Sequence, residues 1–230
     1  MKKIVSLVIV VFFILNVAKV MAQHPSFTFF GGANMATTDV KFGSTNTDIE
    51  DSFKPLYGMN IGAFYDHVLN KDKSQEISVE SGLIFENKGY HQKPNETQFS
   101  DNKTTLYYVD VPLYLKYRYR FRSRNKFYVG AGPYVGVGLF GNYNYKFQYP
   151  GAAETASSSE SIKWGNDSME DDYKRLDYGL SGKMGFLFLN GFNVCVSYDY
   201  GLANIAVIET EEAKNRIFRL SIGYTLMLDD

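Results

Sequence analysis

Alternation of apolar and polar residues runs through the chain after residue 23, and it constrains the fold more than any other feature. Between residues 109 and 119, aliphatic or aromatic side chains occupy every second position, and charged residues dominate the positions between them. A period of two places one residue class on each face of a β-strand. Eight segments are predicted as strands: 27–34, 57–67, 76–88, 109–119, 127–140, 176–188, 192–200 and 218–226.

The separators between these segments alternate between two lengths. Three are short polar turns, at 70–74, 122–125 and 190–191. Four are longer, at 35–55, 91–103, 142–172 and 203–214. Short turns at one end and long loops at the other are typical of outer-membrane barrels. We therefore expect an all-β fold, an eight-stranded antiparallel up-and-down transmembrane β-barrel, with both ends of the chain on the short-turn side.

Glycine indicates which face of each strand points inward. Gly130, Gly132, Gly136 and Gly138 share the polar face of segment 127–140. A face in water has no reason to collect glycine, which weakens strands, whereas a narrow barrel interior needs small residues beside large ones. The polar face should therefore line the interior and the apolar face should meet lipid. The aromatic content of 16% suits rings of side chains at the two headgroup levels.

The charges assigned to the interior nearly balance. We expect a charge network of Glu80, Asp110, Lys116, Arg118, Asp177, Lys183, Asp199 and Arg219, with Glu76, Glu86 and Lys88 on the same faces. The interior of an eight-stranded barrel is just wide enough for side chains to fill it. The sequence therefore predicts an ion-paired lumen that does not conduct as a porin does.

The first residues have the pattern of an export signal. Lys2 and Lys3 precede an apolar run at 4–15, which is too short to span a bilayer, and Ala22 ends a stretch that suits signal peptidase. We expect a cleaved signal peptide at 1–22 and a barrel domain at 23–230. Cys195 is the only cysteine, so an intramolecular disulfide is excluded.

No pattern points to catalysis or to a cofactor. The three histidines lack zinc-ligand spacing, and no Gly-x-Ser-x-Gly turn accompanies a histidine. The glycines at 130–136 have G-x-G-x-x-x-G spacing with no helix after them, unlike a nucleotide loop. A formal net charge of −1 argues against nucleic-acid binding through bulk positive charge. We expect no enzymatic activity, no cofactor, no metal and no nucleic-acid partner.

Several stretches together resemble the PorT family of Bacteroidetes-type outer-membrane β-barrel proteins. They are GLIFENKGY at 82–90, VDVPLYLKY at 109–117, FYVGAGPYVG at 127–136, DYGLS at 177–181, YGLAN at 200–204 and NRIFRLSIGY at 215–224. The resemblance implies an eight-stranded barrel inserted into outer-membrane lipid by the barrel insertion machinery, no catalytic residues and, for one branch, an association with type IX secretion. Such barrels commonly end on an aromatic residue, whereas this sequence ends Leu228-Asp229-Asp230. Either Tyr224 serves in a displaced insertion signal or insertion depends on other residues.

The longest separator, 142–172, carries six acidic residues and Trp164. It is interpreted as a solvated acidic loop, with a calcium-ordered loop or a recognition surface anchored by Trp164 as alternatives. The leading functional hypothesis is a non-enzymatic structural or interaction barrel of the bacterial outer membrane, whose loops 35–55 and 142–172 contact a secretion-system or surface protein. The alternatives are a small-molecule binder that uses the loop-side mouth near Trp164 and a soluble lipocalin-like carrier.

Overall fold

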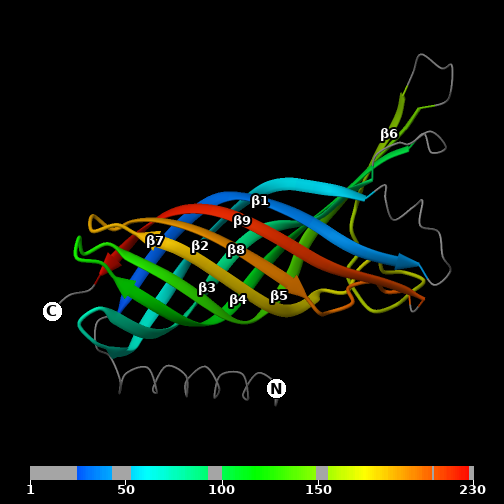
Figure 1. Ribbon diagram of the computed structural model, residues 1–230. Helices are drawn as coiled ribbons and strands as arrows, with labels where there is room; N and C mark the ends of the chain where they lie inside the picture. Colours follow the sequence, from blue (N-terminus) through cyan, green and yellow to red (C-terminus); the bar gives the residue numbers. More distant parts are fainter. Residues whose placement is uncertain (1–24, 43–52, 93–99, 149–154, 209, 228–230) are drawn as a thin grey trace.

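The computed structural model describes residues 25–42, 53–92, 100–148, 155–208 and 210–227. These residues form nine β-strands: β1 (Ser26–Phe42), β2 (Phe53–Lys71), β3 (Gln75–Gln92), β4 (Ser100–Arg120), β5 (Lys126–Gln148), β6 (Thr155–Ser161), β7 (Leu176–Leu187), β8 (Phe192–Gly201) and β9 (Glu211–Met227). All except β6 close into an antiparallel ring, because β1 pairs with both β2 and β9, and β4 pairs with β5. Figure 1 shows this closed barrel from the side.

The eight predicted strands are confirmed, but the strands extend into segments that were predicted as long loops. Strand β1 continues to Phe42, β4 begins at Ser100, and β9 begins at Glu211, all inside segments that the sequence assigned to loops. These extensions pair with their neighbours without apolar alternation, since backbone hydrogen bonds alone continue the ladder beyond the lipid band. Residues 43–52, about half of the first predicted long loop, lie outside the described residues.

Strands β5 and β6 form an arm that the sequence did not predict. β5 is 23 residues long, and its last seven residues pair with all of β6. Figure 1 shows this hairpin extending beyond the loop end of the ring. Residues 157–161 of β6 are exposed, and β6 pairs with no strand other than β5 among the described residues.

Apolar side chains face outward and polar side chains face the interior of the barrel, as the positions of the glycines predict. Along β4, the exposed side chains Val111 and Leu115 alternate with the buried side chains Asp110, Tyr114 and Lys116. Large apolar side chains elsewhere on the ring, such as Ile61, Leu83, Leu180 and Ile222, are also at least half exposed. Because the interior holds charges rather than an apolar cavity, the lipocalin-like alternative is wrong.

The interior also contains aromatic side chains, which the sequence analysis assigned mainly to headgroup rings. Phe30 and Phe64 stack with their ring centroids 4.8 Å apart, and Phe64 meets the edge of Tyr114. Tyr108 and Tyr134 are buried as well. Aromatic residues therefore occupy both faces, and part of the aromatic content fills the lumen.

Among the described residues, no helix is long and apolar enough to cross a membrane. The predicted signal peptide, 1–22, lies outside the described residues.

Replacing Val111 with arginine tests the outward face. Val111 is 45% exposed near the middle of β4, so V111R should lower the free energy of unfolding in lipid by about 2–4 kcal/mol. Urea unfolding in liposomes, followed by gel mobility, measures this change. The matched control is S168R in an exposed loop, and equal losses in both variants would contradict the assignment.

Candidate functional site

The structure brings all eight predicted network residues into the barrel interior. They lie on β3, β4, β7, β8 and β9, and none is more than 7% exposed: Glu80, Asp110, Lys116, Arg118, Asp177, Lys183, Asp199 and Arg219. They divide into two groups along the barrel axis.

The group nearer the turns is centred on Glu80 and Asp66. Glu80 accepts hydrogen bonds from Lys116 on β4 and Lys183 on β7. Asp66 on β2 pairs with Lys116 and accepts a hydrogen bond of 2.7 Å from Nη2 of Arg118. Each of these two carboxylates thus lies beside two cations, and this ion pairing offsets the free-energy cost of removing the charges from water.

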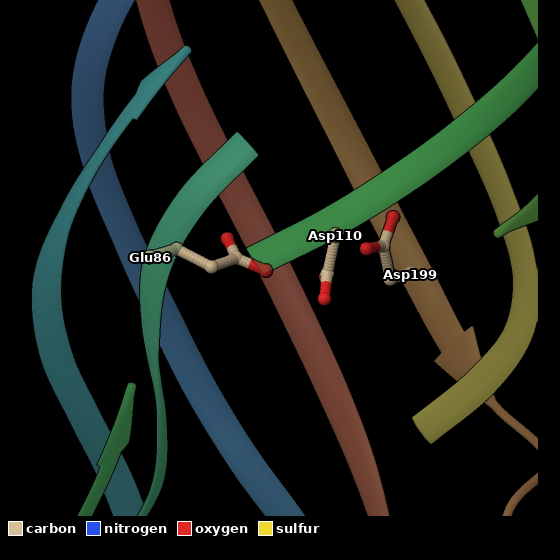
Figure 2. Close-up of side chains that lie close together, drawn as sticks. All are labelled: Glu86, Asp110 and Asp199. Carbon is tan, nitrogen blue, oxygen red and sulfur yellow. The ribbon is translucent and has the colours of Figure 1, made fainter. Parts of the chain in front are cut away.

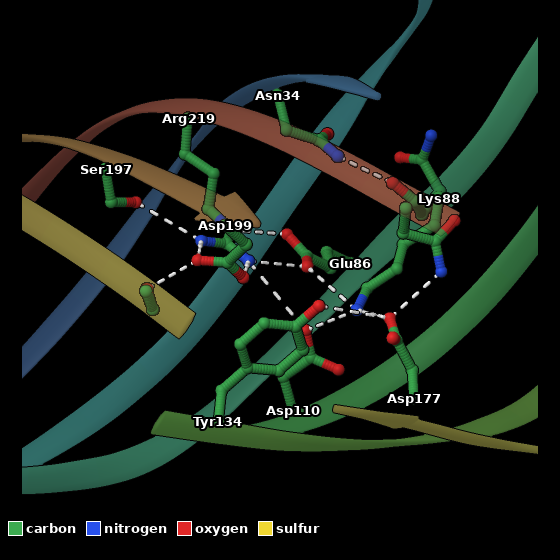
Figure 3. Close-up of polar contacts among 12 residues, drawn as sticks. Asn34, Glu86, Lys88, Asp110, Tyr134, Asp177, Ser197, Asp199 and Arg219 are labelled. Atoms are coloured by element: carbon green, nitrogen blue, oxygen red, sulfur yellow. Dashed lines mark hydrogen bonds and ion pairs between the residues drawn. The ribbon is translucent and has the colours of Figure 1, made fainter. Parts of the chain in front are cut away.

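The group nearer the loops is centred on Arg219 and Lys88, as Figure 3 shows. Arg219 binds Glu86 in a bidentate way, through Nε at 2.5 Å and Nη2 at 2.7 Å, and donates from Nη1 to Asp199 at 2.9 Å. Lys88 lies 2.7 Å from Asp110 and 2.9 Å from Asp177. Bidentate guanidinium–carboxylate pairs combine strength with fixed geometry. The group links five strands, β3, β4, β7, β8 and β9.

Three carboxylates of this group lie as close together as the ligands of a metal site: Glu86, Asp110 and Asp199. One oxygen of each lies within 4.8 Å of the others, and Figure 2 shows the three side chains converging from separate strands. Arg219 contacts all three, and Lys88 lies within ion-pair distance of Glu86 and Asp110. The chain's own cations therefore fill the position that a metal ion would take.

Uncharged side chains complete the network. Ser181 donates to Asp199 at 2.5 Å and lies 2.7 Å from the Tyr114 hydroxyl. Nζ of Lys183 lies 3.9 Å from the centre of the Phe64 ring, and Nζ of Lys88 lies 4.6 Å from that of Tyr108. Cation–π contacts of this kind favour a charge in a site with little water.

Trp164 closes the loop-side end of the lumen. Its ring meets the edge of the Tyr108 ring at 5.6 Å and lies against Gly138, where a Cβ atom would come within 2.4 Å of it. The Arg175 guanidinium stacks at 6.0 Å on the Trp164 ring. Trp164 thus packs inward and is half-buried, unlike the expected solvated loop, whereas residues 166–170 of the same separator are exposed.

Residues 162–173 fold over this mouth through carboxylate contacts to the backbone. Asp171 accepts a hydrogen bond of 2.9 Å from the Asp167 amide, and Asp172 accepts one of 2.7 Å from the Lys163 amide. Tyr173 lies below, with its hydroxyl 3.0 Å from that of Tyr90. Burial, and next the adjacent Tyr90 hydroxyl, raise the pKa of Tyr173 well above its usual value, so Tyr173 stays neutral.

Sequence reasoning missed Asp66 and the interior tyrosines. Asp66 stands on the polar face of its strand, in register with Glu80, so alternation alone could have found it. Tyr108, Tyr114 and Tyr134 also stand at inward positions, but a tyrosine at such a position carries no signal that it contacts a lysine or a carboxylate.

Removing Arg219 tests the energetic weight of the network. R219A leaves Glu86 and Asp199 buried without their main cation, so it should cost about 3–5 kcal/mol in urea unfolding. The partly exposed Lys214–Glu212 pair provides the control, because K214A should cost no more than about 1 kcal/mol. Adding E86Q and D199N to R219A should recover part of the loss. Similar values for R219A and K214A would show that the network is not stabilising.

Several solved structures are similar to this one. The structure is similar to Ail of Yersinia pestis in complex with the heparin analogue sucrose octasulfate (16% identity, 89% of this chain and 100% of that chain, TM-score 0.36). It is also similar to OprG of Pseudomonas aeruginosa (15% identity, 87% and 95%, TM-score 0.47) and to Neisserial surface protein A (13%, 87% and 96%, TM-score 0.39). The comparison with curated proteins gives no match.

The family model described as "Outer membrane protein beta-barrel domain" matches residues 21–207, most of the chain. The protein is accordingly located in the bacterial outer membrane, with its apolar outer face in lipid. The chain belongs to the outer membrane protein beta-barrel domain family.

Proposed function

We propose that this protein is a non-enzymatic interaction component of the outer membrane that recognises a partner protein through its loop-side end. The barrel acts as a rigid support, and the β5–β6 arm provides the contact surface. The exposed edge of β6 is the observation that carries this proposal.

An unpaired strand edge presents a row of free backbone N–H and C=O groups, to which an extended segment of another protein can add as a further strand. The described part of β6 has only β5 as a neighbour, and Ser157, Ser158 and Ser159 are exposed along it. Small polar side chains leave the backbone accessible and do not promote non-specific hydrophobic association at this edge. These features favour strand addition by a partner.

The filled lumen favours an interaction role over a channel role. Arg219, Lys88 and their carboxylate partners cross the interior at mid-height, and Trp164 lies above them against Tyr108. Ion pairs between strands on opposite sides of a narrow barrel leave no continuous water path. Transport through the lumen would require these pairs to separate.

The resemblance to the PorT family of Bacteroidetes supports a more specific version of the proposal, in which the partner belongs to type IX secretion. In this version residues 1–22 direct export, the barrel insertion machinery places the mature chain in the membrane, and no cofactor takes part.

A photo-crosslinking amino acid at Ser158 tests the partner surface. In cells, irradiation should give one reproducible protein adduct, which mass spectrometry would identify as a secretion or surface component. Matched positions are Ser168, exposed on the mouth loop, and Leu113, on the lipid face. Absence of a protein adduct at Ser158, or the same adduct at Leu113, would contradict a role for the arm.

A second candidate function is binding of a small cationic molecule at the loop-side mouth. A cavity of about 600 Å³ opens there, and its charged lining residues are five acids and one base: Glu160, Lys163, Glu170, Asp171, Asp172 and Glu211. This excess of carboxylates favours a cationic ligand. The nearby Trp164 offers a fluorescence signal, although it is not one of the cavity's lining residues.

Spermidine is a suitable probe for this cavity. Titration should change Trp164 fluorescence, and the double variant E170Q/E211Q should weaken the apparent affinity at least about fivefold, because two lining charges are removed. Glu212 lies beside Glu211 but does not line the cavity, so E212Q is the control. The same apparent affinity in the unaltered protein, E170Q/E211Q and E212Q would exclude this site.

A further inference from the structure

The opposite end of the barrel, at the short turns, has a cavity of its own. Its volume is about 270 Å³, and it lies among the turn-side ends of β2, β4, β5 and β9 and the β7–β8 turn. We call it the turn-side vestibule, and its charged lining residues are Lys71, Glu76, Arg118, Arg120, Arg124 and Lys126. Five cations and one carboxylate therefore line the vestibule, the reverse of the balance at the loop-side mouth.

Glu76 neutralises only part of this charge. It accepts hydrogen bonds from Arg120 at 2.6 Å and from Lys126 at 3.1 Å, and its Oε2 lies 3.2 Å from Nε of Arg118. One carboxylate is thus shared by three cations. Lys71 and Arg124 form no ion pair with any residue that the structure describes, so the described lining of the vestibule has a positive excess.

The cations at the base of the vestibule are fixed in place. Arg118 is 4% exposed and Lys126 is 8% exposed, and Arg118 is also held by Asp66. The Nε–H of Arg118 makes no well-aligned hydrogen bond to a described residue, although Glu76 is near. A buried donor that lacks an acceptor is costly, and an anion in the vestibule would supply the acceptor.

Arg124 at the rim has an unfavourable backbone conformation. Its φ is 65°, in the left-handed region, and it is the only residue other than glycine with positive φ in the described part of the chain. Glycine or asparagine suits such a turn position better than arginine does. The Arg124 side chain adds a positive charge to the lining of the cavity.

We propose that the turn-side vestibule is a binding site for a phosphate-bearing anion. A phosphate group carries one negative charge as a diester and up to two as a monoester, with several acceptor oxygens, which suits a site where one carboxylate leaves cations unbalanced. Val68, Leu187, Phe188 and Met227 also line the vestibule and can contact the organic part of a phosphate ester. The phosphate can come from a soluble ester or from the headgroup of a phospholipid in the adjoining leaflet.

Calorimetric titration of the full chain in an uncharged detergent tests the proposal. One arm uses glycerol 3-phosphate and the other uses short-chain phosphatidylglycerol below its micelle concentration. Saturable binding in either arm, weakened by added salt, is the expected result, and the tighter arm identifies the source. Absence of saturable binding in both arms would overturn the site, as would binding of an aspartate-rich peptide without binding of either phosphate.

Two double variants test whether phosphate binding depends on the charges at the rim of the vestibule. K71Q/R124Q removes two exposed rim charges and should weaken phosphate binding at least about tenfold while leaving thermal unfolding unchanged. K73Q/R122Q removes two charges from the same turns that do not line the vestibule, and it should bind within about twofold of the unaltered protein. Equal affinities in both double variants would refute the assignment.

R124G distinguishes binding from a purely structural role. Glycine accepts a φ of 65° without strain, so R124G should keep or raise the stability of the protein. It should nevertheless weaken phosphate binding, because the charge is lost. Unchanged affinity in R124G would show that Arg124 does not bind the anion.

Discussion

The pairing of buried charges inside a narrow barrel is the constraint on which the rest of the structure depends. The lipid-facing side must be apolar, so the polar residues that the ring also carries have to be accommodated within it. Arg219 pairs with Glu86 and Asp199 at the centre, and Lys88 pairs with Asp110 and Asp177. A single unpaired member would leave a charge with neither water nor partner, which explains why the interior is dense with contacts between strands that are distant in sequence.

The charge arrangement gives the two ends of the molecule different chemistry. The loop-side mouth is acidic, whereas the turn-side vestibule is basic, and the paired groups in between separate the two. Because the lumen is filled, a ligand at one end does not reach the other. Recognition at the β5–β6 arm and anion binding at the turns are therefore independent proposals, and each can fail without the other.

Much of the fold follows from local pattern, and the departures have physical reasons. Alternation located all eight ring strands, and the glycines at 130–138 showed which face points inward. The ends of the strands were wrong, because hydrogen-bonded ladders continue above the membrane without an apolar face, as β1 does as far as Phe42. β6 was missed because a serine-rich segment has no alternation to detect, and its pairing with the end of β5 is a tertiary contact.

By itself, the sequence determined the closed antiparallel barrel, the orientation of its faces and the near balance of interior charge, since each depends on a period of two and on residue type. Only the tertiary structure decided which charge meets which. Arg219 finds Glu86 at a sequence separation of 133, across the offset between strands that closing the ring imposes. The inward position of Trp164 depends likewise on Gly138 leaving room and on Tyr108 providing a surface. Such contacts depend on the shape of the closed barrel, which no stretch of sequence encodes locally.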